Sequence, residues 1–231
     1  MKIALFGYGK MGKMIEGIAT KRGHEIVARI GKDDNPELNG ADVAIDFSIP
    51  EAAFSNITHC FENNTPVVSG TTGWLEKYSD AIEACKKNKG AFIYASNFSL
   101  GVNLFFELNK KLAAMMASTP SYEARMEEIH HIHKLDAPSG TAITLAEGII
   151  ENSAYSSWKL GESKENEVSI TSKRTGEVPG THTITWESQV DRIDITHTAH
   201  NREGFGLGAV IAAEWLKDKE GVFSMKDVLN L

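Results

Sequence analysis

Short apolar runs are spaced regularly along the first hundred residues. They predict five buried strands, at 2–6, 25–30, 41–47, 65–69 and 91–95. Between these runs, apolar residues recur at helical spacing. Strands that alternate with helices are typical of a parallel, doubly wound sheet, whose ligand crevice lies at the carboxyl ends of the strands.

Helix signals support this alternation. A helical pattern follows Gly12, and a second one begins at Pro50, where Ser48 is placed to act as the capping residue. A third helical pattern covers 74–87. The chain therefore predicts an α/β fold at its N-terminal end.

The pattern changes after a predicted helix at 102–117. Apolar and polar residues then alternate in four segments, which predict strands with one covered face: 122–127, 168–173, 182–186 and 190–196. The polar stretch 151–166 is expected to be a surface excursion. The glycine-rich stretch 176–180 is expected to be a loop.

A helical pattern returns at 204–216 and is followed by a short amphipathic tail at 222–231. We therefore expect a first domain at 1–101, completed by 202–231, and a second α+β domain at 102–201. The chain would cross between the domains twice, which is typical of a hinge that closes over bound ligands.

A glycine turn, GYGKMG, joins the first strand to the first helix. In a dinucleotide site Gly7 would permit the tight turn, Gly9 would let a pyrophosphate approach, and Gly12 would let the helix pack on the strand. A purely structural glycine turn is the alternative. Two further small, polar loops follow predicted strands, GTTG at 70–73 and ASNF at 95–98. An ordinary turn is the alternative for GTTG.

Lys32 stands near the position where an NAD site usually offers a carboxylate to the ribose. A lysine there can pair with a 2′-phosphate, which favours NADPH. Asp33 and Asp34 follow at once, and a surface lysine without a ligand is the alternative. The choice between NADPH and NADH therefore stays open.

The segment 128–142, EIHHIHKLDAPSGTA, combines histidines, a lysine and a predicted helix start. His130 and Lys134 offer exchangeable protons and charge, and N–H groups at a helix start attract anions. The chain must turn for His130, His131 and Lys134 to converge. A packed or surface histidine is the alternative for any one of them, His133 included. Zinc is also conceivable, but the lysine opposes a cation, so no metal is expected.

Composition narrows the function. The chain has 231 residues, of which 42% are hydrophobic and 24% charged, with a net charge of −7 and a pI near 5.6. An acidic, globular chain argues against a nucleic-acid or membrane partner. Cys60 and Cys85 have no paired spacing and are expected to be reduced, and no signal peptide or membrane span is apparent, so a cytoplasmic protein is expected.

Several segments together resemble the dihydrodipicolinate reductase family. They are KIALFGYGKMG, GTTG, ASNFSLGVN, EIHHIHKLDAPSGTA and, at 196–202, THTAHNR. The resemblance implies a Rossmann-like dinucleotide-binding domain and a second domain for substrate binding and oligomerisation. It also implies a homotetramer and an enzyme that uses NADPH or NADH to reduce a cyclic imine dicarboxylate to tetrahydrodipicolinate, in diaminopimelate and lysine biosynthesis.

The resemblance also implies roles for individual residues. His130 would donate or accept a proton, Lys134 would donate one, and His131 would hold the substrate with Gly140 and Thr141. Chemistry adds Ser139 to the anion-binding helix start. With Lys32 added from the charge argument, the expected cofactor contacts are Gly7, Tyr8, Gly9, Lys10, Met11, Gly12, Lys32, Gly70, Thr71, Thr72, Ala95, Ser96, Asn97 and Phe98.

A different interpretation remains open from the residues alone. A nucleotide-sensing regulator or an aldehyde dehydrogenase can share the same general architecture. A thioester-forming dehydrogenase needs a cysteine at the crevice, yet Cys60 and Cys85 fall within helical patterns. A sensor has no need of His130 and Lys134 beside an anion site.

Overall fold

The computed structural model describes residues 1–32 and 34–231, so of the two acidic residues after Lys32 only Asp34 is described. The chain forms two compact units. Unit 1 comprises Met1–Leu100 and Glu203–Leu231, and unit 2 comprises Gly101–Arg202. The boundaries expected from the sequence lie within one residue of these. No helix among the described residues is long and apolar enough to cross a membrane.

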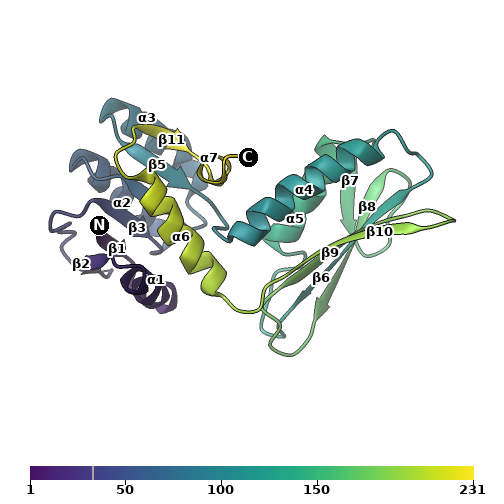
Figure 1. Cartoon of the computed structure of the whole chain (residues 1–231), viewed down its shortest axis with the longest axis horizontal. Coiled ribbons are helices and arrows are strands. Elements are labelled where there is room, and N and C mark those ends of the chain that lie inside the picture. The colour runs from purple at the N-terminus through teal and green to yellow at the C-terminus, as the bar shows by residue number, and fades with distance from the viewer. Residues whose placement is uncertain (33) are drawn as a thin grey trace. The chain divides into compact units, whose positions relative to one another are not determined.

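Unit 1 contains a six-stranded parallel sheet in the order β11-β5-β4-β3-β1-β2 (Figure 1). The strand order reverses between β1 and β3, and this switch point is where open α/β sheets bind ligands. The strands are β1 (Lys2–Phe6), β2 (Glu25–Ile30), β3 (Val43–Asp46), β4 (Val67–Ser69), β5 (Ala91–Tyr94) and β11 (Gly221–Phe223).

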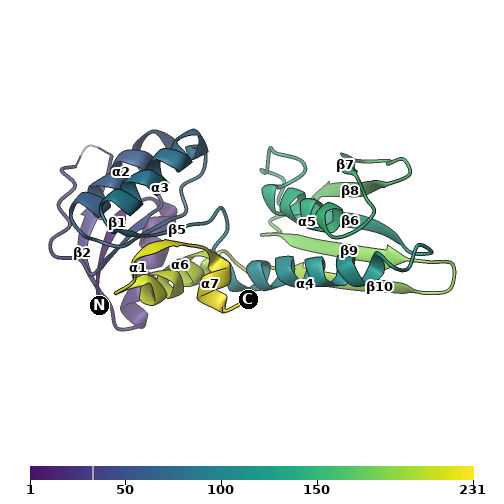
Figure 2. The same ribbon diagram turned by 90° about the horizontal axis from the view of Figure 1, so that it is seen from above.

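Helices cover both faces of this sheet (Figure 2). One face packs on α1 (Lys10–Lys21) and α6 (Glu203–Leu216), and the other on α2 (Pro50–Glu62) and α3 (Tyr78–Lys87). A 3-10 turn, η1 (Leu75–Lys77), precedes α3, and α7 (Met225–Leu229) ends the chain's regular structure. Alternate strand residues enter the two cores, as the buried apolar runs predicted.

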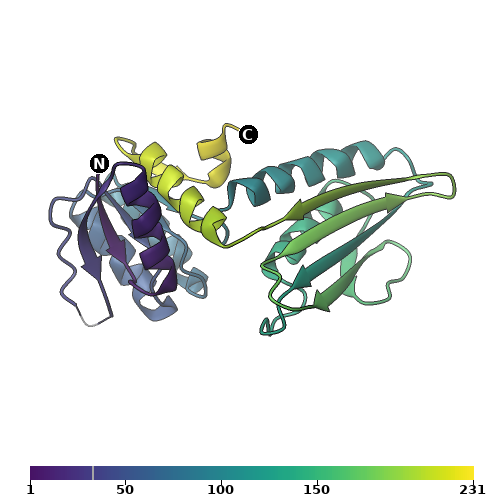
Figure 3. The same cartoon turned by 60° about the horizontal axis from the view of Figure 1, so that its bottom comes forward.

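Unit 2 contains a five-stranded mixed sheet in the order β10-β9-β6-β8-β7. Figure 3 shows the hairpin of β9 and β10 beside β6. Apolar residues on one face pack on α4 (Leu100–Met116) and α5 (Gly140–Glu151). The strands are β6 (Glu123–His130), β7 (Ser157–Leu160), β8 (Glu167–Arg174), β9 (Thr181–Glu187) and β10 (Arg192–Thr198).

Three local predictions were wrong. The segment 151–166 contains the edge strand β7, and the tail contains β11, which pairs with β5. Ser48 does not cap α2. Its N-cap is Ile49, and the Ser48 hydroxyl instead donates to Asp46 Oδ1 over 2.6 Å. A buried carboxylate competes successfully for a nearby hydroxyl because its own burial requires hydrogen bonds.

Candidate active site

The glycine turn of unit 1 has the geometry predicted for it. Gly7 has φ of +85°, and a Cβ there would lie 2.1 Å from the Phe47 carbonyl oxygen. A Cβ on Gly12 would lie 2.2 Å from the Gly7 carbonyl oxygen, so the third glycine allows α1 to pack against the turn. Only glycine fits these two positions.

Gly9 is different, because a Cβ there would meet nothing within 4 Å. It is the N-cap of α1, and no side chain caps the helix. The first N–H groups of α1 therefore keep their capacity to bind an anion such as a pyrophosphate. Lys10 and Met11 open the helix, Lys10 exposed and Met11 packed against the core.

A pocket of about 480 Å³ lies at this turn. Five of the predicted cofactor residues or their neighbours line it: Gly7, Tyr8, Gly9, Gly31 and Lys32. The Tyr8 hydroxyl donates to Glu16, which also pairs with Arg29, so the ring is fixed against α1 and β2. The Asp34 carboxylate accepts the Gly31 N–H over 2.7 Å, which turns it back onto its own loop.

Buried Asp46, at the end of β3, organises the GTTG loop. Its carboxylate accepts hydrogen bonds from Ser69 over 2.7 Å and from Thr71 over 2.8 Å. The Thr71 hydroxyl also accepts the Ser48 N–H, so it is engaged inside the unit. This differs from the expected accessible hydroxyl, and of the two threonines only Thr72 is exposed.

Gly70 and the ASNF loop complete this edge of the sheet. A Cβ on Gly70 would lie 2.3 Å from the Phe47 ring. The Phe98 side chain is 1% exposed and belongs to the core, where it packs on Phe47. Ala95 and Asn97 are partly buried, and Ser96 is exposed. Asn97 Oδ1 accepts the Ser99 N–H over 2.9 Å.

In unit 2, His130 is the last residue of β6 and is largely buried. Its Nδ1 bonds to Glu128, a carboxylate with 0% exposure. Although burial raises the pKa of Glu128, hydrogen bonds from groups including His130 and Arg174 prevail and lower that pKa to about 2. Glu128 is therefore an acceptor only, and His130 Nδ1 carries the proton of this bond.

The chain turns directly after His130, as convergence of the predicted residues requires. The Lys134 N–H donates to the His131 carbonyl over 3.1 Å. The Lys134 ammonium bonds both carboxylate oxygens of Asp136 at 2.8 Å and lowers the pKa of that carboxyl. Lys134 is thus held by an acidic neighbour two residues further on.

His131 lies beside Arg202, with 3.2 Å between its Nε2 and an Arg202 guanidinium nitrogen. Burial and this guanidinium lower the pKa of His131. Arg202 ends the THTAHNR segment that contributes to the family resemblance, but it was not among the predicted site residues. His133 is exposed and pairs with Glu177 at 3.4 Å.

Ser139 is the N-cap of α5, and its hydroxyl oxygen accepts the Ala142 N–H over 3.2 Å. The predicted helix start is therefore confirmed. Gly140 opens the helix, and a Cβ placed on it would meet nothing within 4 Å. Thr141 follows it and is partly buried. An anion can approach this helix end closely.

His182, on β9, contacts both Ser139 and His130. Its Nε2 lies 3.2 Å from the Ser139 hydroxyl, and its ring meets the His130 ring edge to face with 5.1 Å between centroids. Burial lowers the pKa of His182 to about 4, with nearby His130 acting in the same direction. His182 is therefore neutral near pH 7 and shares a hydrogen bond with the Ser139 hydroxyl.

Glu128, His130 and His182 offer three metal-ligating atoms within 4.8 Å of one another. Both oxygens of Glu128 already accept bonds, from His130 and from Arg174. A cation would lie beside the Arg174 guanidinium, which repels it. The donor set does not favour a metal.

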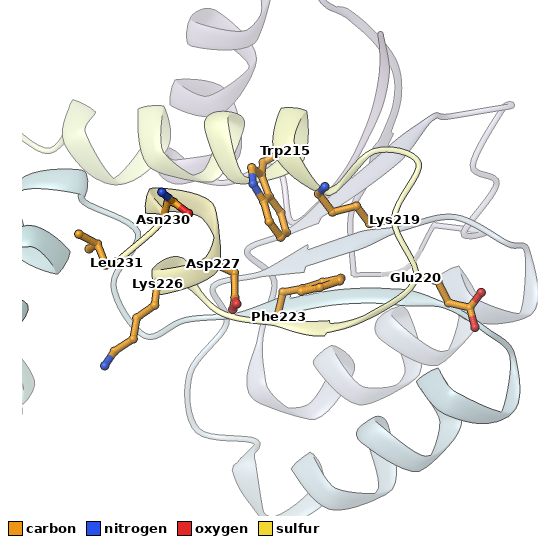
Figure 4. Close-up of a pocket in the computed structure, with 8 residues that line it drawn as sticks. All are labelled: Trp215, Lys219, Glu220, Phe223, Lys226, Asp227, Asn230 and Leu231. Carbon is orange, nitrogen blue, oxygen red and sulfur yellow. The ribbon is translucent and has the colours of Figure 1, made fainter.

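A separate pocket of about 410 Å³ lies where α6, β11 and α7 meet (Figure 4). The Lys219 ammonium lies 4.3 Å from the centre of the Trp215 ring, and the Asp227 carboxylate is engaged by Ser224. None of the predicted site residues lines this pocket.

Four residues of the unit 2 site were missed as functional candidates: Glu128, Asp136, Arg174 and His182. Alternation along the strands contained a signal for two of them. Glu128 falls in phase with buried Ala124 and Met126, and His182 with buried Ile184. A buried ionisable side chain in an apolar row indicates a partner or a function.

Two family models match the chain. The model described as dihydrodipicolinate reductase, N-terminus, matches residues 1–98, and the one described as dihydrodipicolinate reductase, C-terminus, matches residues 101–229. A curated 4-hydroxy-tetrahydrodipicolinate reductase of Christiangramia forsetii is 61% identical over 100% of this chain and 98% of its own length. A protein of the same name from Buchnera aphidicola subsp. Schizaphis graminum is 36% identical over 87% of this chain and 77% of its own length.

Solved structures share the fold. A dipicolinate-bound dihydrodipicolinate reductase from Paenisporosarcina sp. TG-14 has a TM-score of 0.78 and 24% identity, over 97% of both chains. A probable dehydrogenase from Thermotoga maritima has a TM-score of 0.60 and 11% identity, over 99% of this chain and 92% of that one.

A parallel sheet with an uncapped glycine turn after its first strand is typical of nucleotide-dependent oxidoreductases, and the family models and curated relatives that match this chain are of that class. The chain belongs to the dihydrodipicolinate reductase family. The family, the fold class and the use of a pyridine nucleotide expected from the sequence are thereby confirmed.

Proposed function

We propose that this chain reduces a cyclic imine dicarboxylate with NADPH or NADH, giving tetrahydrodipicolinate for diaminopimelate and lysine biosynthesis. The observation that supports the proposal is the folded 128–142 segment, in which His182 contacts both the His130 ring and Ser139, the N-cap of α5. Its position in a chain 61% identical to a curated 4-hydroxy-tetrahydrodipicolinate reductase supports the choice of reaction.

Unit 1 would bind the nucleotide. The uncapped start of α1 and the open space at Gly9 fit a pyrophosphate, and the adjoining pocket of about 480 Å³ offers Lys32 at its rim. Among the described residues that line this pocket, Lys32 carries the positive charge, whereas the Asp34 carboxylate is turned toward the Gly31 N–H. We propose that NADPH is preferred over NADH.

Unit 2 would bind the substrate. The Paenisporosarcina relative carries dipicolinate, a planar ring with two carboxylates. In this chain His131 with Arg202, and Gly140 with Thr141, supply donors for two such groups. Ser139 keeps the helix start in place as its N-cap.

When bound, the reduced nicotinamide supplies a hydride to the ring carbon that is conjugated with the C=N group. The electron pair moves to the ring nitrogen, and a proton must then be added to the substrate. His130 would handle a proton at Nε2, because Nδ1 is committed to Glu128. Lys134 would stabilise the developing negative charge and donate a proton.

We also propose that the reaction needs no metal, because the Arg174 guanidinium already supplies the positive charge beside the Glu128 carboxylate. Turnover should be unchanged within about 20% after dialysis against a strong chelator, as expected when general acid and base groups supply the proton steps. Loss of turnover that zinc restores would contradict this.

The direct test mixes purified protein with NADPH and freshly generated substrate and follows the loss of nicotinamide absorbance. We expect turnover with the wild-type chain. A variant carrying both His130→Gln and Lys134→Ala should lose more than about 100-fold in kcat, the range typical of lost acid and base groups. Normal turnover by that variant would remove the proposed roles of both residues.

The remaining expectations are part of the same proposal. Both cysteines are free and buried, which is compatible with a reducing compartment such as the cytoplasm. A homotetramer is proposed from the family resemblance, and sedimentation analysis of the purified chain would test it.

A further inference from the structure

Glu128 is an unusual residue for the centre of a sheet. It lies on β6, the middle strand of unit 2, in a buried row with Ala124 and Met126. Its side chain is 0% exposed. A carboxylate in such a place is costly unless charged and hydrogen-bonding partners surround it, so its partners indicate what it does.

Strand register supplies those partners from both sides. On β9, His182 lies opposite Glu128, and on β8, Arg174 lies opposite His130. Paired residues share a face of a sheet, so all four side chains are on the covered face. The arrangement follows from the sheet itself and needs no loop to form.

Glu128 divides its two oxygens between different partners. Oε2 accepts His130 Nδ1–H, and Oε1 accepts an Arg174 guanidinium N–H over 2.9 Å. The charge of Arg174 offsets the buried negative charge, and the bond to His130 fixes the plane and tautomer of the imidazole.

Arg174 contacts the turn after β6 as well as Glu128. Its Nη2 also donates to the Asp136 carbonyl over 2.6 Å, and its Nε donates to the Lys134 carbonyl over 3.3 Å. One guanidinium therefore ties the turn that carries Lys134 to the carboxylate that orients His130. A lysine cannot replace it, because a single ammonium lacks the fork of donors.

We propose that Glu128 and Arg174 are positioning residues of the reaction: Glu128 orients His130 through Nδ1, and Arg174 holds Glu128 and the Lys134 turn in fixed relation. This inference rests on the proposed function, because it assumes that His130 and Lys134 handle protons. Neither Glu128 nor Arg174 touches the substrate in this scheme.

A double-mutant cycle separates positioning from structural support. Glu128→Gln is measured in the wild-type chain and in the His130→Gln chain. We expect kcat to fall about 10- to 100-fold in the wild-type chain, the range found for groups that orient a reacting side chain. KM should change less than about 3-fold. In the His130→Gln chain the further loss should be under about 3-fold, because the residue oriented is already gone.

The matched control is Glu127→Gln. Glu127 is the preceding residue on β6, lies on the opposite face and pairs with Lys173 at 2.5 Å. The same chemical change there should leave kcat unaltered. Equal losses from Glu128→Gln in both backgrounds, or no loss in the wild-type chain, would overturn the proposal.

Arg174→Lys tests the second residue. We expect a fall in kcat of about 10-fold or more, with the charge retained, because the lysine cannot bond Glu128 and the Lys134 turn together. Arg125→Lys is its control, since Arg125 forms an exposed ion pair with Glu187 on the other face. Unchanged kcat in Arg174→Lys would overturn the role of Arg174.

Folding is checked by the thermal midpoint of every variant. If Glu128→Gln does not fold, the cycle is run with Glu128→Asp, which keeps the charge but shortens the reach to His130. Two results distinguish a failure of the proposed function from a failure of the positioning role. If His130→Gln alone leaves kcat unchanged, the proposed function of His130 is wrong. If His130→Gln lowers kcat but the cycle shows no coupling, only the positioning role is wrong.

Discussion

The charged residue Lys134 of unit 2 forms an ion pair with a residue close to it in sequence. Lys134 pairs with Asp136, and the side chains are 20% and 58% exposed. Such a pair contributes only about 0–1 kcal/mol to folding in solvent. The ion pair therefore orients the Lys134 ammonium but contributes little to the stability of the fold.

Lys134→Ala should lower kcat by about 100-fold, because the reaction would lose its proposed cation and proton donor. The thermal midpoint should move by no more than about 3 °C, as expected for an ion pair that solvent reaches, in a domain of this size. Steady-state kinetics and calorimetry would measure both. Lys173→Ala, which breaks the exposed pair with Glu127, is the control and should leave kcat unchanged.

Lys32→Glu should shift the nucleotide preference. A carboxylate at the rim of the pocket repels a 2′-phosphate, so the Kd for NADPH should rise about 10-fold while the Kd for NADH changes little. Fluorescence titration with both nucleotides measures this. Lys21→Glu, at the far end of α1, makes the same charge change elsewhere. An equal effect of both variants would show that only net charge matters.

The sequence identified candidate residues better than their partners. Of the predicted residues in the 128–142 segment, His130 and Ser139 contact His182, and the Lys134 carbonyl accepts from Arg174, but neither His182 nor Arg174 was selected beforehand. Ser139 and His182 are 43 positions apart and Glu128 and Arg174 are 46 positions apart, and no local pattern indicates such distant partners. The roles of the predicted site residues stay predictions.

At the scale of elements, the turn between β1 and α1 uses its glycines for two different purposes. Gly7 and Gly12 admit backbone contacts that any Cβ would block, whereas Gly9 faces open space. The first two serve the fold, and the third is available to a ligand.

Gly7→Ala and Gly9→Ala should therefore separate stability from binding. Gly7→Ala forces a positive φ on alanine and a clash with Phe47, so the free energy of unfolding should fall by more than about 2 kcal/mol. Gly9→Ala should keep that free energy within about 1 kcal/mol but weaken NADPH binding about 10-fold, because its methyl group occupies the pyrophosphate's approach. Urea unfolding and nucleotide titration give the two readouts. A stable Gly7→Ala or a tight-binding Gly9→Ala would contradict the assignment.

Long, strongly patterned elements were predictable and short edge strands were not. The parallel strands of unit 1 are apolar runs because both faces are buried. In contrast, β7 lies at the edge of its sheet and carries two exposed residues of four, and β11 has three residues, none fully buried. Pairing with β8 and β5 makes them strands.

At the scale of the whole molecule, acid sensitivity should follow from buried histidines. Burial holds the pKa of His182 at about 4, whereas the unfolded chain has the ordinary value near 6.5. As the pH falls, the unfolded state binds a proton first. His182 therefore contributes full stability above about pH 6.5, and that contribution is lost between about pH 6.5 and pH 4.

The loss should reach about 3 kcal/mol for this residue, and His197, whose pKa burial also lowers, adds to the same trend. Urea unfolding between pH 7 and pH 4.5 would measure it. His182→Gln should flatten the slope, whereas His200→Gln, at an exposed position, should leave it unchanged. An equally steep slope in the His182 variant would refute this account.

The sequence by itself determined the α/β class, the glycine turn, the start of α5 and the family, because each depends on residues adjacent along the chain. Tertiary structure alone decided that Glu128 and Arg174 meet His130, that Asp46 engages Thr71, and that the tail adds a sixth strand. These contacts depend on strand order and register. Both are set by which apolar faces pack together across the whole unit, and local propensity does not encode that choice.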